Sequence, residues 1–180
     1  MDLTTRWLGL ELKNPLVPSA SPLTRSLDAS RRLEDAGAAA LVMYSLFEEA
    51  VRIEEESMVR FLHHQDTGFG EADSFLPDHI DFPGELDRYL EQVATLKATL
   101  GIPVVASLNG VSPGGWLQHA KEIQAAGADA LELNVYYVAA DPDQPGTAVE
   151  QRYLDVLASL AAGISIPINL KLSPQFSSVS

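Results

Sequence analysis

The stretch IPVVASLNG (102–110) decides the fold, because it is a short apolar run that ends in polar residues. Four other runs are also too short for a helix and bounded by turn residues: PLVPSAS (15–21), AAALVMYSL (38–46), ADALELNVY (128–136) and IPINLKLS (166–173). Near-continuous apolar runs of this length are typical of parallel strands that are covered on both faces. We therefore predict five parallel strands.

Between these runs lie segments whose apolar residues recur at helical spacing. They predict helices over 26–36, 84–100, 113–126 and 147–162, each closed by a glycine: Gly37, Gly101, Gly127 and Gly163. Alternating strands and helices imply right-handed parallel crossovers, so the chain is an α/β protein. Both a doubly wound open sheet and a (βα)₈ barrel satisfy this pattern.

The polar ends of the predicted strands favour the barrel. Barrels place their chemistry at the rim formed by the carboxyl ends of the strands. No GxGxxG follows the first predicted strand, as a dinucleotide-binding sheet would require. Before that strand, LTTRW (3–7) and LELKN (10–14) flank a Leu-Gly turn, which predicts a hairpin that plugs the barrel bottom.

The chain length then limits how much of a barrel is present. A whole (βα)₈ barrel needs about 250 residues, and this chain has 180. We expect residues 1–180 to form a single incomplete barrel domain, the N-terminal five-strand portion of a TIM barrel, with a long acidic loop insertion over 62–83. The alternative is a half-barrel that completes itself by forming a homo-oligomer.

Composition excludes several classes of function. The chain has 25 acidic and 12 basic residues, a net charge of −13, which disfavours nucleic-acid binding. It has no cysteine, which excludes disulfides, thiolate metal sites and a cysteine nucleophile. No signal peptide and no apolar run of about 18 residues is present, so we expect a cytoplasmic protein that acts on a small molecule without contacting a membrane.

Four motifs, taken in order, resemble one enzyme family. NPLVPSAS (14–21), SLNG (107–110), ELN (132–134) and KLSP (171–174) are similar to the class 1 dihydroorotate dehydrogenases and to the flavin domain of dihydropyrimidine dehydrogenase. The resemblance implies an FMN-dependent oxidoreductase that acts on a CH–CH bond in pyrimidine metabolism. It implies that Ala20, Ser21, Asn134 and Lys171 bind FMN, and we add Ser45 and Asn109 from their places at strand ends.

The chain also departs from the family pattern. The family has a lysine at the end of the second strand, where this sequence reads Met43, Tyr44 and Ser45. The loop after ELN lacks the cysteine or serine that serves as catalytic base, and Tyr137 falls near its position. An unperturbed tyrosine ionises only near pH 10, which makes it a poor base at neutral pH. Barrels of this type commonly bind phosphate after strands seven and eight, so we expect this chain alone to retain FMN weakly or not at all.

Two other functions remain open from the sequence. The missing base and lysine suggest a catalytically incomplete fragment without turnover. A lysine inside an apolar strand is costly unless it is functional or paired, so Lys171 could instead be the Schiff-base nucleophile of an aldolase.

The histidines and carboxylates of the acidic insertion do not predict a metal site. The sequence contains no HExxH, and adjacent histidines on a loop do not give tetrahedral spacing. We expect no metal at this group: His63, His64, Asp66, Glu71, Asp73 and His79.

Overall fold

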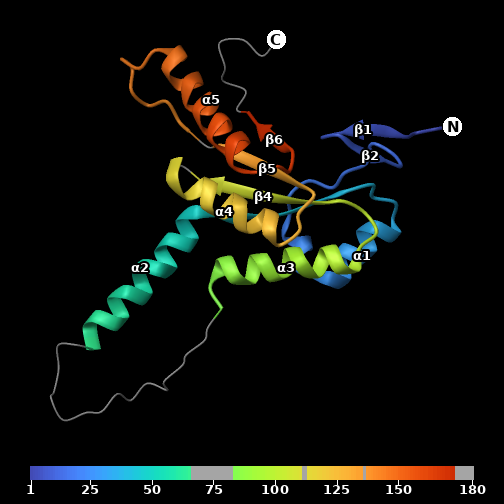
Figure 1. The fold of residues 1–180 in the computed structure, drawn as a ribbon, viewed down its shortest axis with the longest axis horizontal. Helices are drawn as coiled ribbons and strands as arrows, with labels where there is room; N and C mark the ends of the chain where they lie inside the picture. The colour runs from blue at the N-terminus through green and yellow to red at the C-terminus, as the bar shows by residue number, and fades with distance from the viewer. Residues whose placement is uncertain (66–82, 111–112, 136, 173–180) are drawn as a thin grey trace.

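Four parallel strands form the central sheet of the computed structural model, which describes residues 1–65, 83–110, 113–135 and 137–172. The strands are β3 (Leu41–Phe47), β4 (Val104–Gly110), β5 (Ala130–Val135) and β6 (Ile168–Lys171). Their order in the sheet is the order along the chain (Figure 1). This arrangement confirms the predicted parallel strands at 38–46, 102–110, 128–136 and 166–173; each is shorter than predicted, and β3 ends one residue later, at Phe47.

The predicted helices are present: α1 (Leu27–Asp35), α3 (Glu85–Thr99), α4 (Pro113–Ala125) and α5 (Gly146–Gly163). Ser26 caps α1, since its Oγ accepts a hydrogen bond from the Ala29 amide at 3.3 Å. Gly37 and Gly127 have φ values of +104° and +99°, which glycine adopts readily just after a helix. Among the described helices, none is both long and apolar enough to cross a membrane.

The predicted strand over 15–21 is wrong. This segment runs beside β3 without forming a strand, and the 3₁₀ helix η1 (Pro22–Arg25) follows it. The Leu16 and Pro18 carbonyls accept hydrogen bonds from the Ala39 and Val42 amides, at 2.9 and 3.2 Å. Pro15 and Pro18 have no N–H to donate in return, so the segment supplies acceptors but cannot build a full ladder.

Helix α2 (Glu48–Gln65) was not predicted. It extends away from the sheet (Figure 1), and it exposes Ile53 and Val59, so it lacks the buried apolar stripe that predicts most helices. Residues 62–65 belong to this helix rather than to the predicted loop over 62–83. The rest of that loop, 66–82, lies outside the described residues.

The two faces of the sheet pack against different elements. We call the face that packs against helices α3 and α4 the outer face and the opposite one the inner face. The outer face and these helices form the main apolar core, in which Leu41, Leu108 and Leu131 are fully or almost fully buried. On the inner face, a smaller cluster joins the hairpin residues Trp7 and Leu8 to residues at the start of three strands: Val42, Val105 and Ala130.

The hairpin that covers this end of the sheet consists of β1 (Thr5–Trp7) and β2 (Leu10–Leu12), which pair antiparallel. Its turn residues Leu8 and Gly9 both have positive φ values, 53° and 77°. Such a two-residue turn matches the natural twist of paired strands. The predicted hairpin beneath the sheet is thereby confirmed.

One irregularity in the sheet is filled by a helix side chain. The register of β3 with β4 shifts between Val42 and Ser45, next to Ser107 of β4. Tyr89 of α3 is fully buried, and its hydroxyl donates to the Ser107 carbonyl at 3.0 Å and accepts from the Ser107 amide at 2.8 Å. The phenol thus satisfies backbone groups that an interrupted ladder would leave unpaired.

We predict that Tyr89→Phe lowers the free energy of unfolding by about 1–3 kcal/mol, because it leaves buried backbone groups of Ser107 without this partner. Urea unfolding followed by circular dichroism measures the change. The matched control is Tyr137→Phe, whose hydroxyl binds a side chain in a partly exposed loop and which should cost less than about 0.5 kcal/mol. Equal losses in the two variants would contradict the role assigned to Tyr89.

Burial also raises the pKa of Tyr89 above that of an ordinary tyrosine. The unfolded chain ionises this phenol near pH 10 and the folded chain does not, so its contribution to stability is complete below about pH 10 and is lost as the pH rises further. We predict that Tyr89→Phe flattens the fall in unfolding free energy between about pH 10 and pH 11. A slope identical to the wild type would show that Tyr89 is not the group responsible.

Candidate functional site

Polar side chains form two rows across the inner face of the sheet. Ser107 pairs in register with Glu132, and Glu132 with Asn169. One step nearer the carboxyl ends, Asn109 pairs with Asn134, and Asn134 with Lys171. Residues paired in parallel register lie on the same face of a sheet. We call the row of Ser45, Ser107, Glu132 and Asn169 the lower polar layer, and the row of Asn109, Asn134 and Lys171 the upper polar layer.

Ser107 connects the two layers. Its hydroxyl is hydrogen-bonded to the Ser45 hydroxyl at 2.9 Å and accepts from Asn134 Nδ2 at 3.0 Å. Ser107 is fully buried and Asn134 is 6% exposed, so these bonds are shielded from water. Three strands are therefore joined by side-chain hydrogen bonds on the face that does not contact α3 and α4.

Glu132 places a carboxylate in this buried setting, with only 5% of the residue exposed. Asn169 Nδ2 donates to its Oε2 at 3.0 Å, and Lys171 Nζ lies 3.5 Å from its Oε1. Oε1 accepts no hydrogen bond from the described residues. Oε1 is therefore compensated only by the charge of the half-exposed Lys171, so this buried carboxylate is costly to maintain.

Asn109 has the same property in the upper layer. The residue is 9% exposed, and its Oδ1 has no hydrogen-bond partner among the described residues. A buried amide oxygen without a donor is uncommon in a folded protein. The upper layer therefore offers an acceptor on Asn109 that no described residue uses, and in the same layer the amine of Lys171, which is paired with Glu132.

A pocket of about 250 Å³ adjoins the layers at the end of β3. Three residues predicted to bind the cofactor, Ala20, Ser21 and Ser45, line it together. Ser45 also belongs to the lower layer, and the pocket residue Phe47 pairs in register with Asn109. The remaining lining residues are Pro22, Arg25 and Tyr44.

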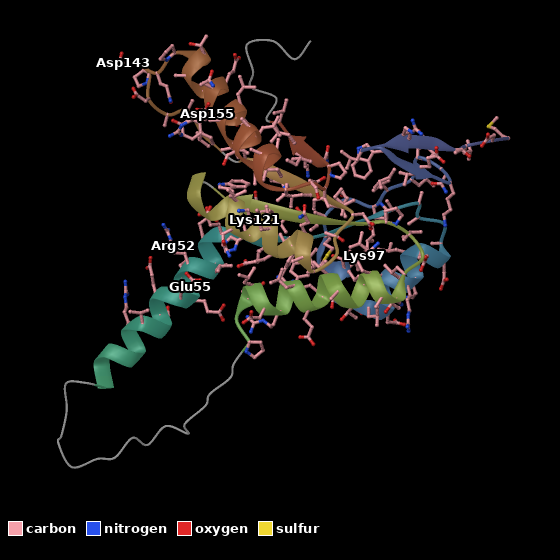
Figure 2. The ribbon with its side chains drawn as sticks, viewed as in Figure 1. Arg52, Glu55, Lys97, Lys121, Asp143 and Asp155 are labelled. Carbon is pink, nitrogen blue, oxygen red and sulfur yellow. The ribbon has the colours of Figure 1, made fainter. Side chains whose placement is uncertain are left out.

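Lys171 does not have the environment expected from its apolar neighbours in the sequence. Its side chain is 52% exposed and is paired with Glu132, so the predicted burial cost is largely absent. It nevertheless extends from the sheet, whereas Lys97 and Lys121 lie on helices α3 and α4 (Figure 2).

Tyr137 lies in the connection between β5 and α5. Its hydroxyl donates to Gln144 Oε1 at 2.6 Å, and the Arg152 guanidinium lies 4.2 Å from the centre of its ring. These contacts join Tyr137 to α5 and to the loop that precedes it. No contact among the described residues joins Tyr137 to the polar layers.

Three residues of the lower layer were missed by sequence reasoning: Ser107, Glu132 and Asn169. The signal was present as polar residues two apart in otherwise apolar strands, namely Ser107 with Asn109, Glu132 with Asn134, and Asn169 with Lys171. A spacing of two puts both members on one face of a strand.

No group of three or more histidine or acidic side chains within the described ranges is placed to hold a metal ion. Of the six residues weighed for a metal site, four (Asp66, Glu71, Asp73 and His79) lie outside the described residues. His63 and His64 lie in α2.

Comparison with known proteins gives relatives by sequence. The chain is 31% identical over 177 residues to dihydroorotate dehydrogenase B (NAD(+)), catalytic subunit, of Methanosarcina acetivorans, covering 96% of this chain and 53% of that protein. The corresponding subunit of Thermoplasma acidophilum is 27% identical, with 99% of this chain and 56% of that protein covered. The chain thus spans about half the length of the curated relatives it matches. No family model matches it.

Comparison of structures addresses the fold alone. A dihydrodipicolinate synthase of Agrobacterium tumefaciens, a TIM-barrel protein, superposes with a TM-score of 0.51 at 14% identity, covering 89% of this chain and 46% of that one. The parallel sheet with its strands in chain order is consistent with part of such a barrel. In sequence, the chain is similar over nearly its whole length to part of the dihydroorotate dehydrogenase catalytic subunits.

Proposed function

We propose that this chain forms part of an FMN-dependent oxidoreductase that acts on a CH–CH bond, like the dihydroorotate dehydrogenases of pyrimidine metabolism. The observation that carries the proposal is the pair of polar layers, in register, on the inner face of a partial barrel. The sequence similarity to dihydroorotate dehydrogenase catalytic subunits supports the choice of reaction.

The residues of the two layers suit a flavin chemically. The pyrimidine edge of a flavin alternates carbonyl acceptors with an N–H donor. Lys171 and Asn134 supply donors for the carbonyls. The buried Oδ1 of Asn109, which accepts no hydrogen bond from the described residues, supplies an acceptor for the N–H. The small side chains of Ala20 and Ser21 at the neighbouring pocket leave space for a flat ring.

In this proposal, each residue has a defined task. Lys171 and Asn134 bind the pyrimidine edge, Ala20 and Ser21 contact the ring, and Ser45 fixes the wall between pocket and layers through Ser107. A cation near the pyrimidine edge stabilises a negative charge that develops there. The chemistry that bound FMN supplies is acceptance of a hydride from a substrate carbon.

The proton that accompanies the hydride needs an acceptor, and Tyr137 stays a prediction for that role. If no residue performs it, the chain is the catalytically incomplete barrel fragment considered above. The aldolase alternative depended on a desolvated Lys171. Since that side chain is half-exposed and paired with Glu132, no observation favours it.

We predict that the purified chain quenches FMN fluorescence on titration and that Lys171→Met weakens this binding by about tenfold or more, the loss of one charge-assisted hydrogen bond. The matched control is Lys121→Met, which removes the same charge from an exposed position on α4 (Figure 2) and should change the dissociation constant less than about twofold. Quenching that the two variants weaken equally would overturn the assignment of Lys171 to the flavin site.

We predict that Glu132→Met leaves the free energy of unfolding unchanged or raises it, although it removes the carboxylate from the site. The substitution removes the desolvation cost of the buried carboxylate, and its partner Lys171 is half-exposed, so the lysine is left in contact with water rather than as an uncompensated buried charge. Urea unfolding measures the change, and Leu133→Met, on the opposite face of the same strand, is the control for introducing a methionine. A loss above about 2 kcal/mol with Glu132→Met alone would make Glu132 a structural residue.

A further inference from the structure

Helix α2 is held to the rest of the molecule by little apolar packing. Among its described side chains only Val51 is buried, and it packs into the main core. Ile53 and Val59 are more than half exposed, and a pocket of about 470 Å³ lies between α2 and the first turn of α3. Segments with few buried apolar contacts open most readily in a folded protein. Contacts of another kind must therefore set how firmly α2 is docked.

Two carboxylates lie on the same side of α2 as Val51. Glu48 and Glu54 are three residues before and three residues after it, and side chains at this spacing are neighbours on a helix surface. Both residues are partly buried, whereas Glu55 and Glu56 are exposed. The side of α2 that faces the protein therefore carries carboxylates on both sides of its one buried valine.

Glu54 caps the start of α3 from outside that helix. Gly84 precedes α3 and has no side chain that could accept a hydrogen bond from the first-turn amides. Glu54 Oε2 instead accepts from the Glu85 amide at 2.6 Å, and its Oε1 lies 3.6 Å from Arg88 Nη2. A carboxylate at the N-terminus of a helix is stabilised by the free N–H groups there. Glu54 therefore fastens α2 to α3.

Glu48 has the same relation to α4. Its carboxylate lies directly against Gly110, at the end of β4, and against Gly115, in the first turn of α4. A Cβ built on either glycine would overlap with this carboxylate. The two glycines thus leave room for an acidic side chain at the N-terminal turn of a helix, where it is favoured. Glu48 therefore fastens the first turn of α2 to β4 and α4.

This contact adjoins the ends of the strands that carry the polar layers. Phe47 directly precedes α2 and pairs in register with Asn109. Gly110, against which Glu48 lies, directly follows Asn109. Any displacement of the first turn of α2 therefore reaches the residues beside Asn109. We call residues 45–47 and 109–110 the strand ends.

We infer that α2 is a releasable strap. Glu48 and Glu54 dock it on the N-terminal turns of α4 and α3, and its release loosens the strand ends. A ligand that needs Asn109 in place binds the docked form more tightly, and its binding holds the strap closed, because coupling between two sites is reciprocal. The inference goes beyond the proposed function, since it holds for any ligand at this edge of the sheet.

Hydrogen–deuterium exchange of the full chain, measured by mass spectrometry without any ligand, tests the strap. In the wild type we expect residues 48–57 to exchange through local opening, faster than residues 104–108 inside β4. We expect Glu48→Gln and Glu54→Gln each to speed exchange of 48–57 and of the strand ends about threefold to tenfold, the loss of one carboxylate contact.

The matched control is Glu55→Gln, which makes the same change at an exposed position of the same helix (Figure 2). It should alter the exchange of 48–57 less than about twofold. The inference is overturned if the variants of Glu48 and Glu54 behave like this control. It is also overturned if exchange rises in 48–57 and stays unchanged at the strand ends, because α2 would then open without affecting the site.

A second variant tests the same contact from the side of α4. Gly115→Ala places a methyl group where the Glu48 carboxylate lies, so we expect it to speed exchange of 48–57 about as much as Glu48→Gln does. This loss should occur although alanine favours a helix more than glycine does. Gly146→Ala is its control, because a Cβ there meets no atom within 4 Å, and it should change this exchange less than about twofold.

In a Glu48→Ala chain, which has no carboxylate at this place, Gly115→Ala should have no further effect on 48–57. An undiminished effect there would overturn the role of Glu48. A variant that fails to fold speeds exchange throughout the chain, including α5, and the wild type then decides: exchange of 48–57 as slow as that of 104–108 overturns the inference. Since FMN is absent from every measurement, failure of the proposed function leaves this result unaffected.

Discussion

The parallel register of β4, β5 and β6 is the constraint on which the rest of the structure depends. It places Ser107, Glu132 and Asn169 in one row and Asn109, Asn134 and Lys171 in the next. A slip of one residue would turn these polar groups into the helix-packed core and bring leucines to the inner face. Leu108, Leu131 and Leu133, buried against the helices, prevent that slip.

Stability and chemistry are thereby assigned to opposite faces of the same strands. The outer face contributes fully buried apolar side chains. The inner face carries the buried carboxylate of Glu132, paired with Lys171, and the amide of Asn109, whose oxygen accepts no hydrogen bond from the described residues. Since a buried polar group without a partner is unfavourable, the outer core must offset the inner face. The hairpin under the sheet contributes as well, because Trp7 and Leu8 cover the apolar starts of the strands and confine the polar groups to the other end.

The fold was largely predictable, because strands β3 to β6 and helices α1, α3, α4 and α5 follow from apolar periodicity and helix-ending glycines. The segment 15–21 was wrongly predicted as a strand because its apolar content was weighed. The lack of backbone N–H donors at Pro15 and Pro18, which prevents a full ladder of hydrogen bonds, was not considered. Helix α2 was missed because it exposes much of its length, including Ile53 and Val59, and a helix without a buried stripe leaves no periodic pattern.

The site was predictable in part. Motifs and strand ends together indicated Ala20, Ser21 and Ser45, which the structure brings to one pocket, and Asn109, Asn134 and Lys171, which it brings to one layer. Motif comparison does not give the register of neighbouring strands. Only the register shows that Glu132 and Lys171 lie on the same face of the sheet.

The hydroxyl of Tyr89 has a mechanical consequence. A hydrogen bond from a helix side chain to a single backbone site constrains the axial position of the helix in addition to its apolar packing. Because Tyr89 binds both backbone groups of Ser107, α3 is held at one axial position along β4, the strand that also carries Asn109.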